Sequence, residues 1–297
     1  MHVHNFLPQF LAALKRWPDR PSEKEFATYL QPVEKLIQPM IDDFIDRFGG
    51  GLYQVTEGLN WEVYRAEALR LDSMNEEKRA RAHIENVEKC LGLHLEGDVV
   101  LFGAFTAMDG YARFDHGKHT VYLGVDESHG RGAYLDILIS HELTHVAREP
   151  LPEIWAGFGL TPDMSHDEFT QNLPVIEHLM GEGFSCVVSE LINPHEPYWN
   201  YVYQTEDSLA QILAHGPAID KVVHAELRKK DKGSYGSLYD TSRYVPEVPR
   251  YAHYVWAWLW ASHVLKTKAG GNPRTLLRLC SKDLLDDALA FKLPKAL

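Results

Sequence analysis

Residues 141–145 read H-E-L-T-H, and this pentad constrains the fold of the chain more than any other feature of its sequence. Two histidines four positions apart lie on one face of an α-helix, about one turn from each other. His141 and His145 can therefore bind one metal ion if the segment is helical. Glu142 then lies beside the metal, where it can act as a general base toward a water molecule.

The residues around the pentad favour a helix. Apolar side chains follow helical spacing, at positions 135, 138, 139, 143 and 146, and no glycine or proline interrupts the run. Pro150 and Pro152 follow, so the helix is predicted to end near Arg148. We therefore expect both histidines within one helix, which is the structural condition for the motif.

Charge and cysteine content limit the possible partners and the compartment. The formal net charge of −12 argues against a nucleic acid as the partner. No apolar run approaches the ~18 residues of a membrane helix, and the N-terminus does not resemble a secretory signal. The three cysteines (Cys90, Cys186 and Cys280) are far apart and odd in number. This usage suits a reducing compartment, so we expect a cytoplasmic protein that binds neither membrane nor nucleic acid.

The hydrophobic pattern divides the chain into two regions. Residues 1–95 are predicted to be mainly helical and to serve as a scaffold or as a wall of a cleft. Residues 96–297 begin with two predicted strands, at 99–102 and 119–125, separated by a loop at 109–118. The pentad helix follows the second strand directly. The expected fold is α+β and mostly helical, with a small β-sheet packed against that helix.

A catalytic zinc site needs three protein ligands and an open position for water. The extended form of the motif, H-E-x-x-H-x-x-G-x-x-H, is excluded because positions 148 and 151 hold arginine and leucine. Glu182, at the edge of an apolar helical sector over 175–191, is the preferred third ligand, since a carboxylate there needs a compensating cation. Gly181 and Gly183 flank it and indicate close approach of another backbone, as when this helix crosses the pentad helix. The rival candidates are Glu177 and Glu190 on the same helix and Asp163, His166 and Asp167 in the loop before it.

With these residues the chain resembles the gluzincin metallopeptidases, in which a glutamate ligand follows H-E-x-x-H on a later helix. The string E-G-F-S at 182–185 is similar to the N-E-G-F-A motif of the M1 aminopeptidases, although the segment between the two motifs is longer here. Size and layout are closer to the predicted zinc-dependent proteases of the DUF2268 type, over about residues 98–266. The resemblance implies a zincin-like catalytic region at 96–297 and one Zn²⁺ per chain, held by His141, His145 and Glu182.

One position departs from the gluzincin pattern. Many members place an aspartate four residues after the ligand glutamate, where it orients a histidine, but this chain has Cys186 there. A side chain from elsewhere must therefore orient the histidine, or none does.

The resemblance also implies a hydrogen-bond donor for the oxyanion that forms during peptide hydrolysis. In gluzincins a tyrosine or histidine from a downstream segment supplies it. Residues 250–260 open a strongly apolar helix with three tryptophans. Tyr254 is the first candidate in this stretch, and His253 and Tyr251 are the next.

These features together predict a zinc-dependent hydrolase of peptide bonds that acts on a peptide or protein substrate. Glu142 is expected to be the general base, and Tyr254 to share the oxyanion with the metal. The alternative is a non-catalytic protein, stabilised by zinc, that serves in binding or regulation. Glu142 favours the enzyme, because a purely structural site has no use for a carboxylate beside its histidines.

Overall fold

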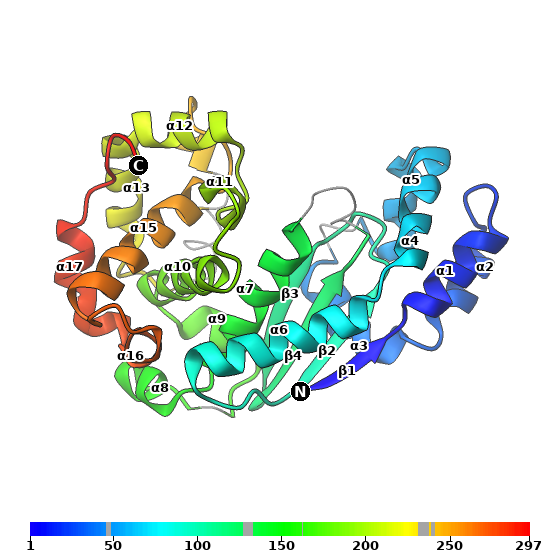
Figure 1. Cartoon of the computed structure of the whole chain (residues 1–297), viewed down its shortest axis with the longest axis horizontal. Coiled ribbons are helices and arrows are strands. Elements are labelled where there is room, and N and C mark those ends of the chain that lie inside the picture. Colours follow the sequence, from blue (N-terminus) through cyan, green and yellow to red (C-terminus); the bar gives the residue numbers. More distant parts are fainter. Residues whose placement is uncertain (46–48, 127–132, 162, 231–237, 239–240) are drawn as a thin grey trace. The chain divides into compact units, whose positions relative to one another are not determined.

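The computed structural model describes residues 1–297 except 46–48, 127–132, 162, 231–237 and 239–240 (Figure 1). The chain is mostly helical and contains one four-stranded sheet. This confirms the α+β, mostly helical fold expected from the sequence. In the described parts of the chain, no helix is both long and apolar enough to cross a membrane.

The sheet is mixed and has the strand order β1-β2-β4-β3. β2 lies between two parallel neighbours, so Val99 pairs with Val3 on one side and with Val121 on the other. Both faces of β2 are covered, since every residue from Val99 to Phe102 is 0 % exposed. The strands are β1 (His2–Asn5), β2 (Asp98–Phe102), β3 (Gly110–Asp115) and β4 (Lys118–Gly124).

Two of these strands lie where the sequence analysis placed other structure. β1 falls within the region 1–95, which was predicted to be mainly helical, and β3 falls within the loop predicted at 109–118. The prediction of a loop there is wrong. The strand was not recognised because β3 is half-exposed along most of its length and its sequence lacks the alternation of apolar residues that marks a strand. The strands predicted at 99–102 and 119–125 are confirmed as β2 and β4.

The first of two compact units comprises residues 1–85, 96–113 and 119–142 and holds most of the sheet. Aromatic rings fill its core, where Phe26 and Phe105 pack with ring centroids 5.0 Å apart. Its helices are α1 (Leu7–Arg16), α2 (Glu23–Leu30), α3 (Glu34–Asp43), α4 (Leu52–Val55), η1 (Thr56–Gly58), α5 (Trp61–Ala68), η2 (Leu69–Ser73) and parts of α6 (Glu76–Leu91) and α7 (Tyr134–Arg148).

Helix α7 carries the pentad, so the prediction of one helix containing both histidines is confirmed. It ends at Arg148, as the two prolines predict, and a further helix, α8 (Pro152–Phe158), begins at the second of them. The sheet packs against it as expected. A side chain at Gly110, the first residue of β3, would come within 2.7 Å of Leu138 on α7.

The second compact unit comprises residues 86–95, 114–118 and 143–297. Helices α10 and α15 pack along each other at its centre. They approach so closely at Gly183 that an added Cβ would lie 2.1 Å from the carbonyl oxygen of Ala257. The described helices of this unit, besides the remaining parts of α6 and α7, are α8 (Pro152–Phe158), α9 (His166–Asn172), α10 (Val175–Ile192), α11 (Tyr198–Tyr201), α12 (Glu206–Ala214), α13 (Gly216–Glu226), η3 (Thr241–Arg243), α15 (Ala252–Thr267), α16 (Pro273–Arg278), η4 (Ser281–Leu284) and α17 (Leu285–Ala290).

Candidate metal centre

Helix α7 holds the two histidines of the pentad in largely buried positions one turn apart. His141 is 2 % exposed, and the side chain of His145 is 13 % exposed. Leu143 and Val146, on the same stretch of helix, lie in the core. Their burial anchors this part of α7 and fixes the backbone that carries the two imidazoles.

Glu182 on α10 completes a group of possible ligands. The ligand atoms of His141, His145 and Glu182 all lie within 4.8 Å of one another. The closest recorded approach joins His145 Nε2 to Glu182 Oε2 at 3.5 Å. Glu182 is 8 % exposed, as its place beside the apolar sector predicts. These three side chains can hold a metal ion.

The donor set fits zinc. Two imidazole nitrogens and one carboxylate oxygen are ligands that Zn²⁺ accepts, and three protein ligands leave a fourth position for water. Bonds of about 2.0–2.1 Å in a tetrahedral site put two ligand atoms roughly 3.4 Å apart. The 3.5 Å between His145 Nε2 and Glu182 Oε2 is close to this separation.

Glu142 follows His141 in α7 and is 8 % exposed. Its carboxylate lies against the start of β3, where a Cβ added to Gly110 would be 2.8 Å from Glu142 Oε1. Any residue larger than glycine would enter the space of this carboxylate. Gly110 thus forms one wall of the position predicted for the general base.

A carboxylate that the sequence analysis missed lies on the other side of His145. Glu149 Oε1 is 3.3 Å from His145 Nδ1, so the ring lies between Glu149 and Glu182. From the sequence, such a residue was expected to come from elsewhere than position 186 or to be absent, and Glu149 was not named as a candidate; the Cys186 thiol is buried, and this burial raises its pKa well above the usual value. The signal that was overlooked is the four-residue spacing from His145, which is one helical turn.

These two carboxylates determine the electrostatics at His145. Burial by itself lowers the pKa of an imidazole, but the charges of Glu182 and Glu149 outweigh it and raise the pKa of His145 well above its usual value. His178 and His253 behave in the opposite way: burial lowers the pKa of each to about 4, against an opposing effect of the Glu182 charge. Negative charge is therefore concentrated at the ligand group and attracts a cation, while the two other imidazoles stay neutral.

The rivals of Glu182 are engaged elsewhere. Glu177 accepts two hydrogen bonds from the buried guanidinium of Arg148, at 2.7 and 3.0 Å. Glu190 accepts one from Trp258 Nε1 at 2.9 Å. Within the described ranges of the chain, no second group of three His, Cys, Asp or Glu side chains is arranged to hold a metal, and Asp163, His166 and Asp167 belong to none.

The glycines on either side of Glu182 have different neighbours from the one that the sequence analysis expected. The backbone that comes close to Gly183 belongs to α15 and not to α7, so the expected crossing with the pentad helix is wrong at this position. Helix α15 packs along α10 and occupies that side. Gly181 does face His145, but a Cβ there would lie 3.6 Å from the ring, which is an ordinary contact.

The candidates for an oxyanion donor lie at the start of α15. Tyr251 immediately precedes the helix. Tyr254 is half-buried, and its ring packs on that of Tyr203 at 5.6 Å. His253 is 0 % exposed and interacts electrostatically with Glu182. Tyr254 therefore stays the first candidate for this role, with His253 and Tyr251 after it.

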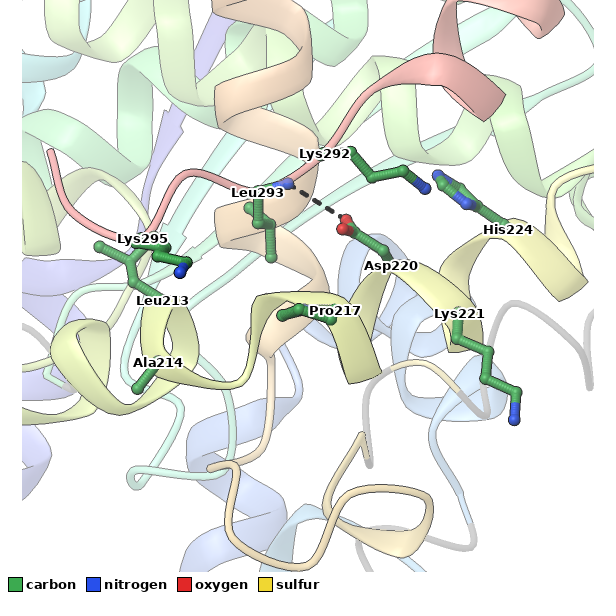
Figure 2. A pocket seen from close by; sticks show the side chains of 9 residues that line it. All are labelled: Leu213, Ala214, Pro217, Asp220, Lys221, His224, Lys292, Leu293 and Lys295. Carbon is green, nitrogen blue, oxygen red and sulfur yellow. Dashed lines mark hydrogen bonds between the residues drawn. The ribbon is translucent and has the colours of Figure 1, made fainter.

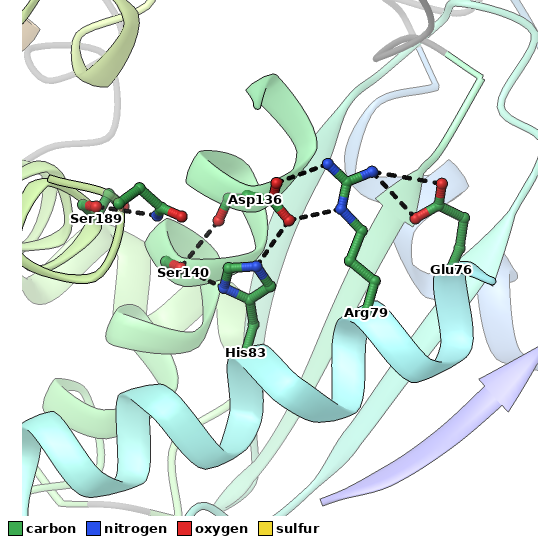
Figure 3. A network of polar contacts seen from close by, with 7 residues as sticks. Glu76, Arg79, His83, Asp136, Ser140 and Ser189 are labelled. Atoms are coloured by element: carbon green, nitrogen blue, oxygen red, sulfur yellow. Dashed lines mark hydrogen bonds and ion pairs between the residues drawn. The ribbon is translucent and has the colours of Figure 1, made fainter. Parts of the chain in front are cut away.

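A Ser-His-Asp array in the first unit has the order of a catalytic triad but not its accessibility (Figure 3). His83 on α6 lies 2.9 Å from Ser140 Oγ through Nδ1 and 2.7 Å from Asp136 Oδ1 through Nε2. Ser140 is 0 % exposed, and its hydroxyl donates to the backbone carbonyl of Asp136 at 2.9 Å. Arg79 also donates to both oxygens of Asp136. We assign this network to the attachment of α6 to α7.

A separate hollow of about 560 Å³ lies in the second unit, between α12, α13 and the C-terminal segment (Figure 2). The carboxylate of Asp220 accepts hydrogen bonds from the backbone N–H of Leu293 at 3.2 Å and from Trp256 Nε1 at 3.1 Å. None of the predicted site residues lines this hollow. It is distinct from the metal group.

Comparisons of the chain with protein family models, with curated proteins and with solved structures gave no match.

Proposed function

We propose that this protein is a zinc-dependent hydrolase of peptide bonds, with the metal held by His141, His145 and Glu182. One observation carries the proposal. The three possible ligands come together beside a further acidic residue, Glu142, which is buried but does not belong to the ligand group. A site that only binds metal gains nothing from a desolvated carboxylate in that place, whereas a hydrolase needs one as a base.

Each residue has a separate task in this proposal. Zinc, when bound, lowers the pKa of its water to about 7 and polarises the substrate carbonyl. Glu142 accepts a proton from the attacking water and passes it to the leaving nitrogen. Tyr254, or His253 in its place, donates a hydrogen bond to the carbonyl oxygen as that atom gains negative charge.

The edge of the sheet supports a peptide as the substrate. β3 is last in the strand order, and Gly110 at its start lies beside Glu142. An extended peptide can add to a sheet edge through main-chain hydrogen bonds. Phe114 O and the Asp115 carboxylate, later in β3, already accept hydrogen bonds from His166, so a peptide would add along the start of the strand, close to the general base.

The substitution Glu142→Gln tests the proposal, because glutamine keeps the shape of the side chain but cannot take up a proton. We expect zinc content to stay at the wild-type level while hydrolysis of a peptide library falls by about 100-fold or more. Glu85→Gln, an exposed change on α6, is the matched control and should have no effect. Full activity of Glu142→Gln would remove it as the base, and loss of zinc would make it a ligand. Zinc bound by a wild-type protein that cleaves no peptide would favour the non-catalytic, zinc-stabilised alternative.

Tyr254→Phe removes a single oxygen atom and tests the oxyanion donor. We expect kcat to fall by about 100-fold, with zinc content and stability nearly unchanged. Wild-type kcat in Tyr254→Phe together with a reduced kcat in His253→Gln would transfer the role to His253.

A further inference from the structure

The imidazole of His145 lies between two carboxylates, one at each ring nitrogen. Nε2 is 3.5 Å from Glu182 Oε2, and Nδ1 is 3.3 Å from Glu149 Oε1. The backbone N–H of Glu149 donates to the carbonyl of His145 at 2.9 Å, so the helical turn continues through Glu149. This turn brings the Glu149 side chain onto the face of α7 that carries His145.

We infer that Glu149 is a positioning residue of the metal centre. Its carboxylate accepts a hydrogen bond from Nδ1–H of His145 and thereby directs Nε2 toward the metal. An imidazole binds a metal only through a nitrogen that carries no proton, and the hydrogen bond at the other nitrogen decides which one that is. An ionised carboxylate only accepts hydrogen bonds, so Nδ1 must be the donor. The inference rests on the proposed zinc site but not on peptide hydrolysis.

The turn that carries Glu149 is held firmly by its neighbour Arg148. The guanidinium of Arg148, in a residue 1 % exposed, pairs with Glu177 on α10 and donates to the carbonyls of Leu277 and Leu279, each at 2.9 Å. The hydrogen bonds to the two carbonyls do not depend on Glu177, and they hold the backbone from which the Glu149 carboxylate reaches His145. Glu149 thus supplies, from the turn that follows α7, the carboxylate contact that position 186 lacks because it holds a cysteine.

Two substitutions separate the hydrogen bond from the charge. Glu149→Leu removes the acceptor, and we expect zinc affinity, measured by competition with a chromophoric chelator, to fall by about 10- to 100-fold. Glu149→Gln keeps an oxygen that can accept from Nδ1–H, so its loss should be smaller. Glu153→Gln is the matched control, since that carboxylate pairs with Arg278 instead, and it should bind zinc as the wild type does.

Imidazole ¹⁵N chemical shifts of the zinc-loaded protein show which ring nitrogen of His145 carries the proton. A purely structural role of Glu149 would not affect this property. We expect His145 to carry its proton on Nδ1 and the metal on Nε2 in the wild type. Wild-type affinity in Glu149→Leu, or zinc on Nδ1 of His145, would overturn this inference and leave the zinc site intact. A wild-type protein that binds no zinc would overturn both. A lower melting temperature of metal-free Glu149→Leu with unchanged zinc affinity would reduce Glu149 to a stabilising residue.

Discussion

The buried ion pair between Arg148 and Glu177 allows a test of which glutamate on α10 binds the metal and which one stabilises the fold. Glu177 and Glu182 are on the same helix, but the structure engages the first with Arg148 and groups the second with the histidines. Glu177→Gln should therefore destabilise the protein without weakening its zinc affinity in the native state. Glu182→Gln should instead lower zinc affinity by about 10-fold or more without destabilising the metal-free protein.

The magnitude follows from the contacts of this pair. Removing one partner of a buried ion pair costs about 3–5 kcal/mol, because the remaining charge is left uncompensated. Glu177 accepts two hydrogen bonds from Arg148 and a weaker one from the backbone N–H of Ser281 at 3.3 Å. The carbonyls of Leu277 and Leu279 still accept from the guanidinium after the substitution. We therefore expect a loss near the lower limit, about 3 kcal/mol of unfolding free energy.

Urea unfolding of the metal-free protein measures this loss by linear extrapolation. The double substitution Arg148→Met with Glu177→Leu removes both charges and is expected to recover most of the stability. A Glu177→Gln protein within about 1 kcal/mol of the wild type would refute the reasoning. Lost zinc affinity at wild-type stability would make Glu177, rather than Glu182, the ligand.

Two further predictions concern packing and pH. Gly183→Ala should cost about 1–3 kcal/mol and lower the melting temperature, because its Cβ would lie 2.1 Å from a carbonyl oxygen of α15. Gly58→Ala has nothing within 4 Å and is the control; equal melting temperatures would refute the close crossing. Burial opposes ionisation of Asp136, but hydrogen bonds from Arg79 and His83 hold its pKa well below the usual range. Its stabilising effect is therefore complete above the unfolded pKa of about 3.9 and is lost as the pH falls below that value. Asp136→Asn should flatten this decline between pH 5 and pH 3 in urea unfolding, and an equal decline in both proteins would contradict the assignment.

The pentad helix and Glu182 could be predicted because both depend on patterns within one helix. The apolar spacing around His141 and the two prolines after Arg148 are local signals that tertiary packing had no reason to override. Glu182 stood out because a carboxylate beside an apolar sector needs a cation. The structure groups it with the two histidines.

The features that escaped prediction depend on partners distant in the sequence or on a spacing that was not considered. β1 is a strand because His2–Asn5 pairs with β2, more than ninety residues later along the chain. β3 is a half-exposed edge strand and has no apolar alternation to reveal it. Gly183 signalled a close approach, but the sequence did not identify α15 as the neighbour. Glu149 was missed because, once position 186 was found to hold a cysteine, the position one helical turn after His145 was not considered as the source of the orienting residue.

The zinc site is the central claim of this account, and the metal content of the purified protein tests it most directly. Protein prepared without chelators should contain about one zinc per chain, bound by two nitrogens and one carboxylate oxygen. His145→Ala should contain none, because it removes a member of the ligand group. A wild-type protein without metal, or an X-ray absorption spectrum with a zinc–sulfur distance of about 2.3 Å, would contradict this assignment.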